Sequence, residues 1–157
     1  MTKQNQTQMR VEKLKGRVVT IEAPSAVVRI FVAKRGNVDD VFVRRIGGVI
    51  EDSYAEVEDV YFDISCEEAK AVYWSLILAA TSGRKIGMEE VDVYYGEYGG
   101  LRLYYFEGHL VYAVKGGEVY DLGRPGDSVR YAADYFEGEE LNAVKQFVEA
   151  LGYVHPH

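Results

Sequence analysis

The chain has 157 residues, of which 48% are hydrophobic and 27% charged, and its formal net charge is -7; this balance is typical of a globular domain with its own core. No apolar run approaches the roughly 18 residues of a membrane-spanning helix, and the N-terminus lacks the apolar stretch of a secretory signal, so we expect a cytoplasmic protein with no membrane partner. The single cysteine, Cys66, excludes an intrachain disulfide and a cysteine-based zinc site.

The beginning of the chain predicts a tail followed by strands. Residues 1–13 are polar and basic without hydrophobic periodicity, so we expect a disordered tail before a domain that covers residues 14–138. Residues 17–22 and 41–46 are rich in β-branched side chains, and each of these segments predicts a strand. A further short strand is expected at residues 60–64.

Residues 24–35 carry two conflicting patterns. Their β-branched side chains favour a strand. However, Pro24 stands just inside the start of the segment and Gly36 just past its end, as at the two ends of a helix. The prediction therefore leans slightly to a helix and leaves the strand open.

The most regular helical pattern covers residues 65–83, SCEEAKAVYWSLILAATSG. Ser65 and Glu68 have the capping-box spacing, and Gly83 stands where a left-handed C-cap is expected. Because apolar side chains surround nearly the whole helix, we expect it to be central and largely buried.

A tyrosine-rich segment with regularly spaced glycines follows this helix. The glycines at positions 99, 100, 108, 116 and 117 have the spacing of hairpin turns. They divide the segment into four expected strands, at residues 91–95, 101–107, 110–114 and 118–122. Such spacing is typical of an antiparallel meander, and the whole chain therefore predicts an α+β fold.

The last part of the chain predicts a short helix in DSVRYAADYF and a C-terminal helix at residues 139–152. The C-terminal helix carries apolar residues at coiled-coil spacing: Leu141, Val144, Val148 and Leu151. This seam covers only about two heptads, fewer than the three or four of a convincing coiled coil. It either packs on the domain or forms a homodimer contact.

Residues that could carry out catalysis are isolated. Cys66 has no histidine near it in the sequence, and His109 is a lone strand residue. A metal-dependent nuclease could use Asp63 with Glu68 and Lys70, but nucleases of that kind carry the Glu-x-Lys pair on a strand, whereas here it falls in the expected helix. No phosphate-binding loop or nucleophile elbow is present. We therefore expect a protein that is not an enzyme and that needs no cofactor or metal.

Positive charge is concentrated near the beginning of the chain. Residues 1–50 hold ten Lys or Arg against four Asp or Glu, a balance of +6, whereas residues 51–157 hold eight against 21, a balance of -13. Five of the basic residues lie close in the sequence to the aromatic residues Phe31 and Phe42: Arg29, Lys34, Arg35, Arg44 and Arg45. Such asymmetry indicates a site for a polyanion, and the alternative is a solvated basic surface.

Strand alternation sorts the aromatic residues into faces. Within residues 101–107 the expected core face is the more apolar one: Leu101, Leu103 and Tyr105. The other face carries Arg102, Tyr104 and Phe106. On the preceding strand Val91, Val93 and Tyr95 are assigned to the core, which places Tyr94 beside Tyr104. Rings bordered by guanidinium groups suit single-stranded nucleic acid. The alternative, which the pattern alone slightly favours, is that the tyrosines belong to a helix-covered core.

Four segments of the chain together form a recognisable pattern: GRVVTIEAPSAVVRIFVAKRG, VFVRRIGGVI, YFDIS and LRLYYFEGHLVYAVKGGEVYDLG. In this pattern, which covers about residues 14 to 151, the chain resembles the ThermoDBP single-stranded DNA-binding proteins of the Thermoproteales. It implies an α+β domain whose antiparallel sheet packs with helices and forms a cleft. In that family the base of the cleft is hydrophobic and takes the bases, basic residues line its edges, and a C-terminal leucine zipper forms the dimer.

These observations predict non-enzymatic binding of single-stranded DNA with little sequence preference, in a thermophilic archaeal setting of replication and repair. The predicted phosphate-contacting residues are Arg29, Lys34, Arg35, Arg44, Arg45 and Arg102. The predicted base-stacking residues are Phe42, Tyr94, Tyr104 and Phe106. A homodimer through the C-terminal helix is the expected protein partner. The alternatives are a protein-interaction module that does not bind nucleic acid, and the metal-dependent nuclease.

Overall fold

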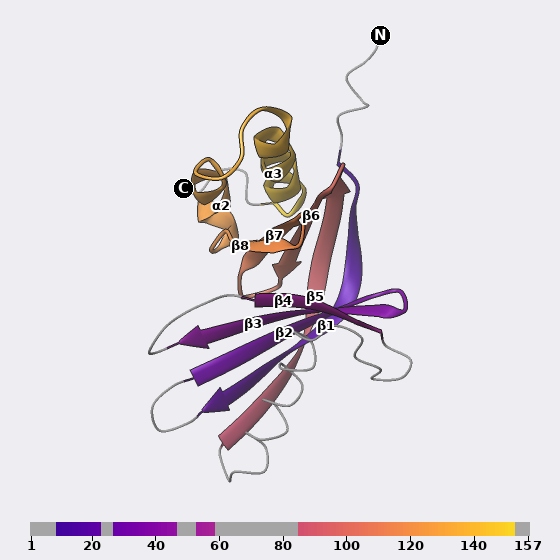
Figure 1. Ribbon diagram of the computed structural model, residues 1–157, viewed down its shortest axis with the longest axis vertical. Coiled ribbons are helices and arrows are strands. Elements are labelled where there is room, and N and C mark those ends of the chain that lie inside the picture. Colours follow the sequence, from indigo (N-terminus) through magenta and orange to yellow (C-terminus); the bar gives the residue numbers. More distant parts are fainter. Residues whose placement is uncertain (1–8, 23–26, 47–52, 59–84, 153–157) are drawn as a thin grey trace. The chain divides into compact units, whose positions relative to one another are not determined.

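The computed structural model describes residues 9–22, 27–46, 53–58 and 85–152. These residues form eight β-strands, a 3-10 turn and two α-helices, in agreement with the expected α+β class (Figure 1). The strands are β1 (Val11–Glu22), β2 (Val27–Arg35), β3 (Val38–Ile46), β4 (Ser53–Glu58), β5 (Lys85–Tyr98), β6 (Leu101–Phe106), β7 (Val111–Lys115) and β8 (Glu118–Asp121). Their hydrogen-bonded order is β4-β3-β2-β1-β5-β6-β7-β8.

The chain divides into two compact units. The C-terminal unit consists of Met1–Lys13 and Val93–His157, and the N-terminal unit consists of Leu14–Asp92. Both β1 and β5 run through the two units. Because β1 begins at Val11, the end of the predicted tail belongs to a strand.

In the N-terminal unit, the segment that leaned to a helix is the strand β2, so that prediction was wrong. β2 pairs antiparallel with β1 on one side and with β3 on the other, which satisfies the backbone groups of its β-branched residues. Gly36, expected as a helix cap, lies with Asn37 in the two-residue turn between β2 and β3. Its φ of 66° is the left-handed conformation that such hairpin turns require.

The other elements of this unit are partly as expected. The strands predicted at residues 17–22 and 41–46 are confirmed within β1 and β3, whereas β4 was not predicted. The strand expected at residues 60–64 and the helix expected at residues 65–83 lie outside the described residues. The buried side chains come from both faces of β2 and β3, and they include Phe31 opposite Phe42.

The C-terminal unit confirms the predicted antiparallel meander. β5, β6, β7 and β8 pair in sequence order, and the helices α2 (Ser128–Ala132) and α3 (Gly138–Ala150) lie on one face of these strands (Figure 1). A 3-10 turn, η2 (Pro125–Asp127), leads into α2. The core between helices and strands contains Leu101, Leu103, Tyr105, Val111, Ala113, Leu122, Ala132, Phe136, Ala143, Val144, Phe147 and Val148.

The predicted face of β6 is confirmed, but that of β5 is wrong. Leu101, Leu103 and Tyr105 belong to the core that the helices cover. Across the hairpin, however, Tyr94 pairs with Tyr105, and Tyr95 pairs with Tyr104. The two-residue turn at residues 99–100 places Tyr98 opposite Leu101 and fixes this register. Tyr94 therefore lies on the helix-covered face, and Val93 and Tyr95 lie on the other.

The seam of the C-terminal helix packs within its own unit. In α3, Val144 and Val148 are buried in the core, and Leu141 and Leu151, which follows the helix, pack against it half-buried. Tyr98 and Glu139 are joined by a hydrogen bond that the tyrosine hydroxyl donates, which raises the pKa of Tyr98 above 10.0. Within the described part of the chain, neither helix has the length and apolarity needed to cross a membrane. The homodimer stays a prediction.

Leu151→Glu separates the two roles of the seam. Because Leu151 is half-buried on the core, we expect the free energy of unfolding to fall by about 0.8–1.5 kcal/mol, roughly half the value of a fully buried leucine. The mass in solution should not change, as measured by light scattering at several protein concentrations. A shift from dimer to monomer in the variant would instead assign the seam to a subunit contact.

Candidate nucleic-acid interface

Two of the predicted phosphate-contacting residues face each other on adjacent strands. Arg29 of β2 and Arg44 of β3 are direct partners in the antiparallel register, so their side chains leave the same face of the sheet. Both residues are half-buried. Direct partners in such a ladder have Cβ atoms only about 4.5–5.5 Å apart. The two arginine side chains therefore start from directly opposite positions on adjacent strands, on the same face of the sheet.

The described surroundings of Arg29 provide it with little compensating charge. Arg29 also faces Thr20 of β1, which is uncharged. The Nε atom of Arg29 is buried, and among the described residues it has no hydrogen-bond partner. Glu22, two residues beyond Thr20 on the same face, is exposed and forms no ion pair with Arg29 in the described structure. Like charges directly opposite each other destabilise a sheet, so an anion between them would be stabilising.

Lys34 and Arg35 instead form ion pairs within the β2–β3 hairpin. The Nζ atom of Lys34 lies 3.3 Å from Oδ1 of Asp39. Arg35 donates from Nε to Oδ2 of Asp40 at 2.7 Å and from Nη2 to Oδ1 at 3.0 Å, a bidentate pair with a fully buried carboxylate. Phosphate contact would compete with these carboxylates. Neither aspartate was predicted as a partner, although a two-residue turn at residues 36–37 places Lys34 opposite Asp39.

The remaining predicted cations have different positions. Arg45 pairs with Val28 on the backbone of β3, and its side chain lies outside the described structure. Arg102 is half-buried on β6, in the C-terminal unit, and stands directly opposite Glu97. Glu97 also accepts a hydrogen bond from the Tyr95 hydroxyl at 3.1 Å. Its carboxylate provides compensating charge on the face of Arg102, so Arg102 is a weaker candidate than the arginine pair.

Three of the four predicted base-stacking rings are buried: Phe42, Tyr104 and Phe106 are each 0% exposed. The expectation that the Tyr104 face is open was therefore wrong. Its ring lies 5.1 Å from that of Tyr95, and Phe106 meets Tyr112 edge to face at 6.2 Å. These four rings form one aromatic layer of β5, β6 and β7, the Tyr104 layer.

Tyr94 is the one of the four predicted rings that retains some exposure. It is half-buried and stacks with Tyr105, with ring centroids 6.2 Å apart and planes inclined by 23°. It packs against the core beneath the helices and not beside Tyr104. Tyr94 lies in the C-terminal unit, whereas Arg29 and Arg44 lie in the N-terminal unit.

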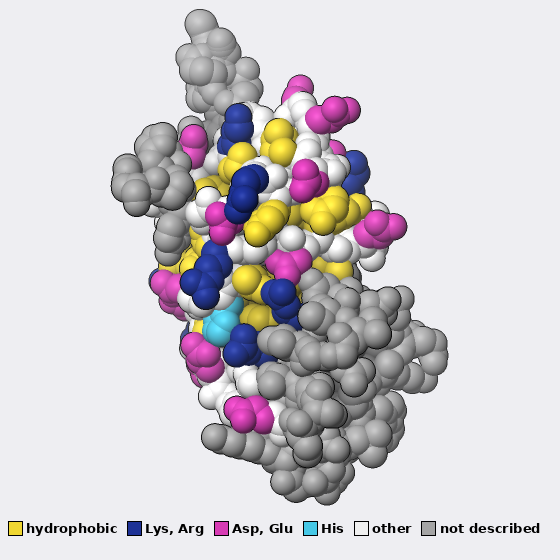
Figure 2. All heavy atoms as spheres, turned by 90° about the vertical axis from the view of Figure 1, so that its left-hand side faces the viewer, with side chains coloured by type: hydrophobic (Ala, Val, Ile, Leu, Met, Phe, Trp, Pro, Cys, Tyr) yellow, Lys and Arg dark blue, Asp and Glu magenta, His cyan; other side chains and the backbone are white. Residues whose placement is uncertain are grey.

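Surface charge and metal-binding groups add little to this site. On the face shown in Figure 2, basic side chains are interspersed with acidic and hydrophobic ones and do not form a continuous basic area. Among the described residues, no three His, Cys, Asp or Glu side chains are grouped so as to hold a metal ion.

Comparison of the chain with protein-family models, with curated proteins and with solved structures gives no match.

Proposed function

We propose that this protein binds single-stranded DNA without catalysis and with little sequence preference, and that Arg29 and Arg44 together contact the phosphate backbone. The observation that carries this proposal is the direct cross-strand pairing of the two arginines, both of which are half-buried and so remain partly open to solvent. A cleft of the ThermoDBP kind, with Tyr94 against a base, is the finer form of the same proposal. It would need no cofactor.

A phosphodiester suits the arginine pair in charge and in hydrogen bonding. Each guanidinium group presents several N–H donors in a planar fork, and a phosphate offers several acceptor oxygens. One phosphate that contacts the exposed parts of both half-buried side chains would offset their mutual repulsion. Contacts of this kind carry no base information, so they favour binding to any sequence.

The test is the salt dependence of binding in Arg29→Gln/Arg44→Gln. A labelled oligothymidylate is titrated by fluorescence anisotropy at several salt concentrations. If both arginines contact phosphates, the slope of log K against log salt should become shallower by about 1.4, about 0.7 for each lost contact. Glutamine keeps a long polar side chain at both half-buried positions, and thermal unfolding of the double variant checks that the fold is preserved.

Arg17→Gln is the matched control for charge. Arg17 lies in the same unit, is exposed, and pairs with Val32, which places it on the opposite face from Arg29. It should leave the slope almost unchanged. Equal slopes in the double variant and the wild type would remove the arginine pair from the site. Shortening of the oligonucleotide with magnesium would favour the nuclease, and no binding at all would favour a protein-interaction module.

A further inference from the structure

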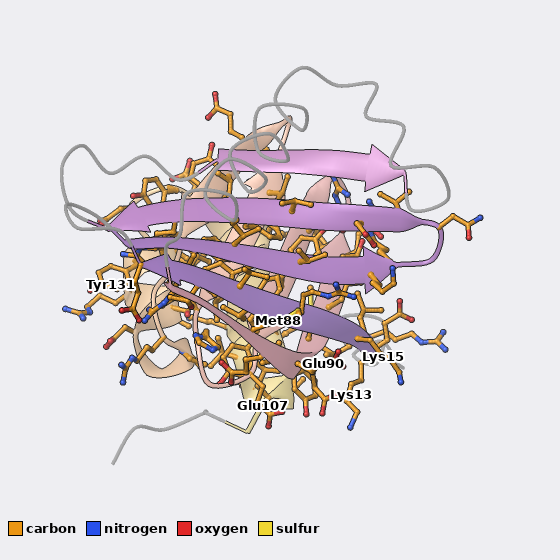
Figure 3. The ribbon with its side chains drawn as sticks, turned by 90° about the horizontal axis from the view of Figure 1, so that it is seen from below. Lys13, Lys15, Met88, Glu90, Glu107 and Tyr131 are labelled. Carbon is orange, nitrogen blue, oxygen red and sulfur yellow. The ribbon has the colours of Figure 1, made fainter. Side chains whose placement is uncertain are left out.

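Two exposed tyrosines lie four residues apart at the end of α2, in the C-terminal unit, and neither is among the predicted site residues. Tyr131 of α2 is 40% exposed, and Tyr135, four residues later in the turn after α2, is 55% exposed. The Tyr131 side chain is labelled in Figure 3. Large hydrophobic side chains with this exposure are candidates for a partner contact when they share one surface.

Both rings rest on the segment at the end of β8. The Tyr131 ring lies against Gly123, because a Cβ atom at that residue would come within 2.7 Å of Cε2 of the ring. The Tyr135 ring lies 5.0 Å from that of Tyr120, which in turn lies 5.1 Å from the ring of the buried Phe136. Tyr120, Tyr131 and Tyr135 are here called the tyrosine surface. Tyr120 and Tyr135 pack on the core through Phe136, and Tyr131 packs on Gly123.

The segment that carries the tyrosine surface is strongly acidic. Residues 118–140 contain seven Asp or Glu and two Arg, a net charge of -5. The Tyr120 hydroxyl donates a hydrogen bond to Glu118 at 3.2 Å. Loss of water around the ring, and then this carboxylate, raise the pKa of Tyr120 above 10.0. Such a surface repels a polyanion and attracts a cation.

The surface already accommodates a guanidinium group. The Cζ atom of Arg130 lies 5.0 Å from the centre of the Tyr131 ring, within the range of a cation–π contact. The same guanidinium group forms an exposed ion pair with Asp127 at 3.2 Å. Rings and carboxylates side by side are what an arginine or lysine of another chain would require, and tyrosine is enriched in protein interfaces.

We propose that the tyrosine surface binds a basic polypeptide segment, whose arginine or lysine side chains lie over the rings while the surrounding carboxylates attract their charge. The partner is a protein and not nucleic acid, because the charge of the segment opposes DNA. This contact is separate from the arginine pair of the N-terminal unit and does not depend on it.

The test uses a fluorescein-labelled nona-arginine peptide, titrated by anisotropy into the wild type and into Tyr131→Leu/Tyr135→Leu. The substitutions keep net charge and most apolar volume, so loss of two cation–π contacts should weaken binding about tenfold or more. Tyr98→Leu is the control, since Tyr98 is similarly exposed on the same unit beside Glu139 and should bind the peptide like the wild type.

A charge variant and a DNA titration provide two further tests of the tyrosine surface. Should the double variant fold poorly, Asp134→Asn/Glu137→Gln removes exposed carboxylates while the rings stay in place, and should weaken peptide binding at least about threefold. Oligothymidylate binding should be unaffected in both variants. Unchanged peptide affinity, or an equal loss in Tyr98→Leu, would overturn the proposal as general charge attraction. Weaker DNA binding alone would overturn it in favour of a nucleic-acid surface.

Discussion

Arg35→Leu is expected to lower the free energy of unfolding by about 3–5 kcal/mol, which is the usual cost of breaking a buried ion pair from one side. The Asp40 carboxylate is fully buried and would lose a bidentate partner whose two hydrogen bonds measure 2.7 and 3.0 Å. Urea or thermal unfolding measures the loss. The effect on DNA binding, corrected for the folded fraction, should be small.

Two variants show that the pair itself is responsible. Arg35→Leu/Asp40→Leu removes both charges and should recover much of the stability, because an apolar pair needs no compensation for desolvation. Lys34→Gln should cost only about 0–1 kcal/mol, since the side chain of Lys34 is 39% exposed and its pair with Asp39 is screened by water. If Arg35→Leu keeps full stability but loses affinity for oligothymidylate, Arg35 is a phosphate ligand as the sequence predicted.

The strands of the C-terminal unit were predictable because glycine marks each turn and the strands between the turns are short. The same glycine rule misled the prediction for β2. Pro24 and Gly36 stand where helix ends are expected, but Gly36 and Asn37 form the hairpin turn that connects β2 to β3. Tertiary pairing decided between two local preferences of similar strength.

Faces were harder to predict than strands. Alternation assigned β6 correctly, because its odd and even residues differ in polarity. It failed on β5, where Tyr94 and Tyr95 are identical and only the register across the hairpin tells them apart. The two-residue turn at residues 99–100 would have supplied that register.

Exposure could not be predicted from the pattern. A strand that is covered on both sides carries apolar residues on both faces, so Tyr104 and Phe106 have the same sequence pattern whether their face is open or covered. The same holds for the basic residues between positions 29 and 45, because a count of charges does not show which side chains form ion pairs. Asp39 and Asp40 form ion pairs with Lys34 and Arg35 across the hairpin. The count of basic residues did not show these pairs.

Tyr104→Ala gives the largest expected contrast between the predicted function of a residue and its observed position. As a base-stacking residue on an open face, it would lose about 1–3 kcal/mol of binding with little loss of stability. In the structure the ring is 0% exposed and packs in the Tyr104 layer, opposite Tyr112 and 5.1 Å from the ring of Tyr95. We therefore expect a core deletion that costs about 3–5 kcal/mol of stability.

Tyr98→Ala is the matched control for the loss of a tyrosine ring in the same unit. Tyr98 is 40% exposed on the neighbouring strand, so its truncation should cost about 0.5–1 kcal/mol, including its hydrogen bond to Glu139. Thermal unfolding and oligothymidylate titration of both variants give four values. If Tyr104→Ala melts like the wild type and binds DNA more weakly, the Tyr104 layer opens in solution and the rings contact bases. If it melts far below Tyr98→Ala while its folded fraction binds normally, the layer is core, and DNA contact belongs to the arginine pair.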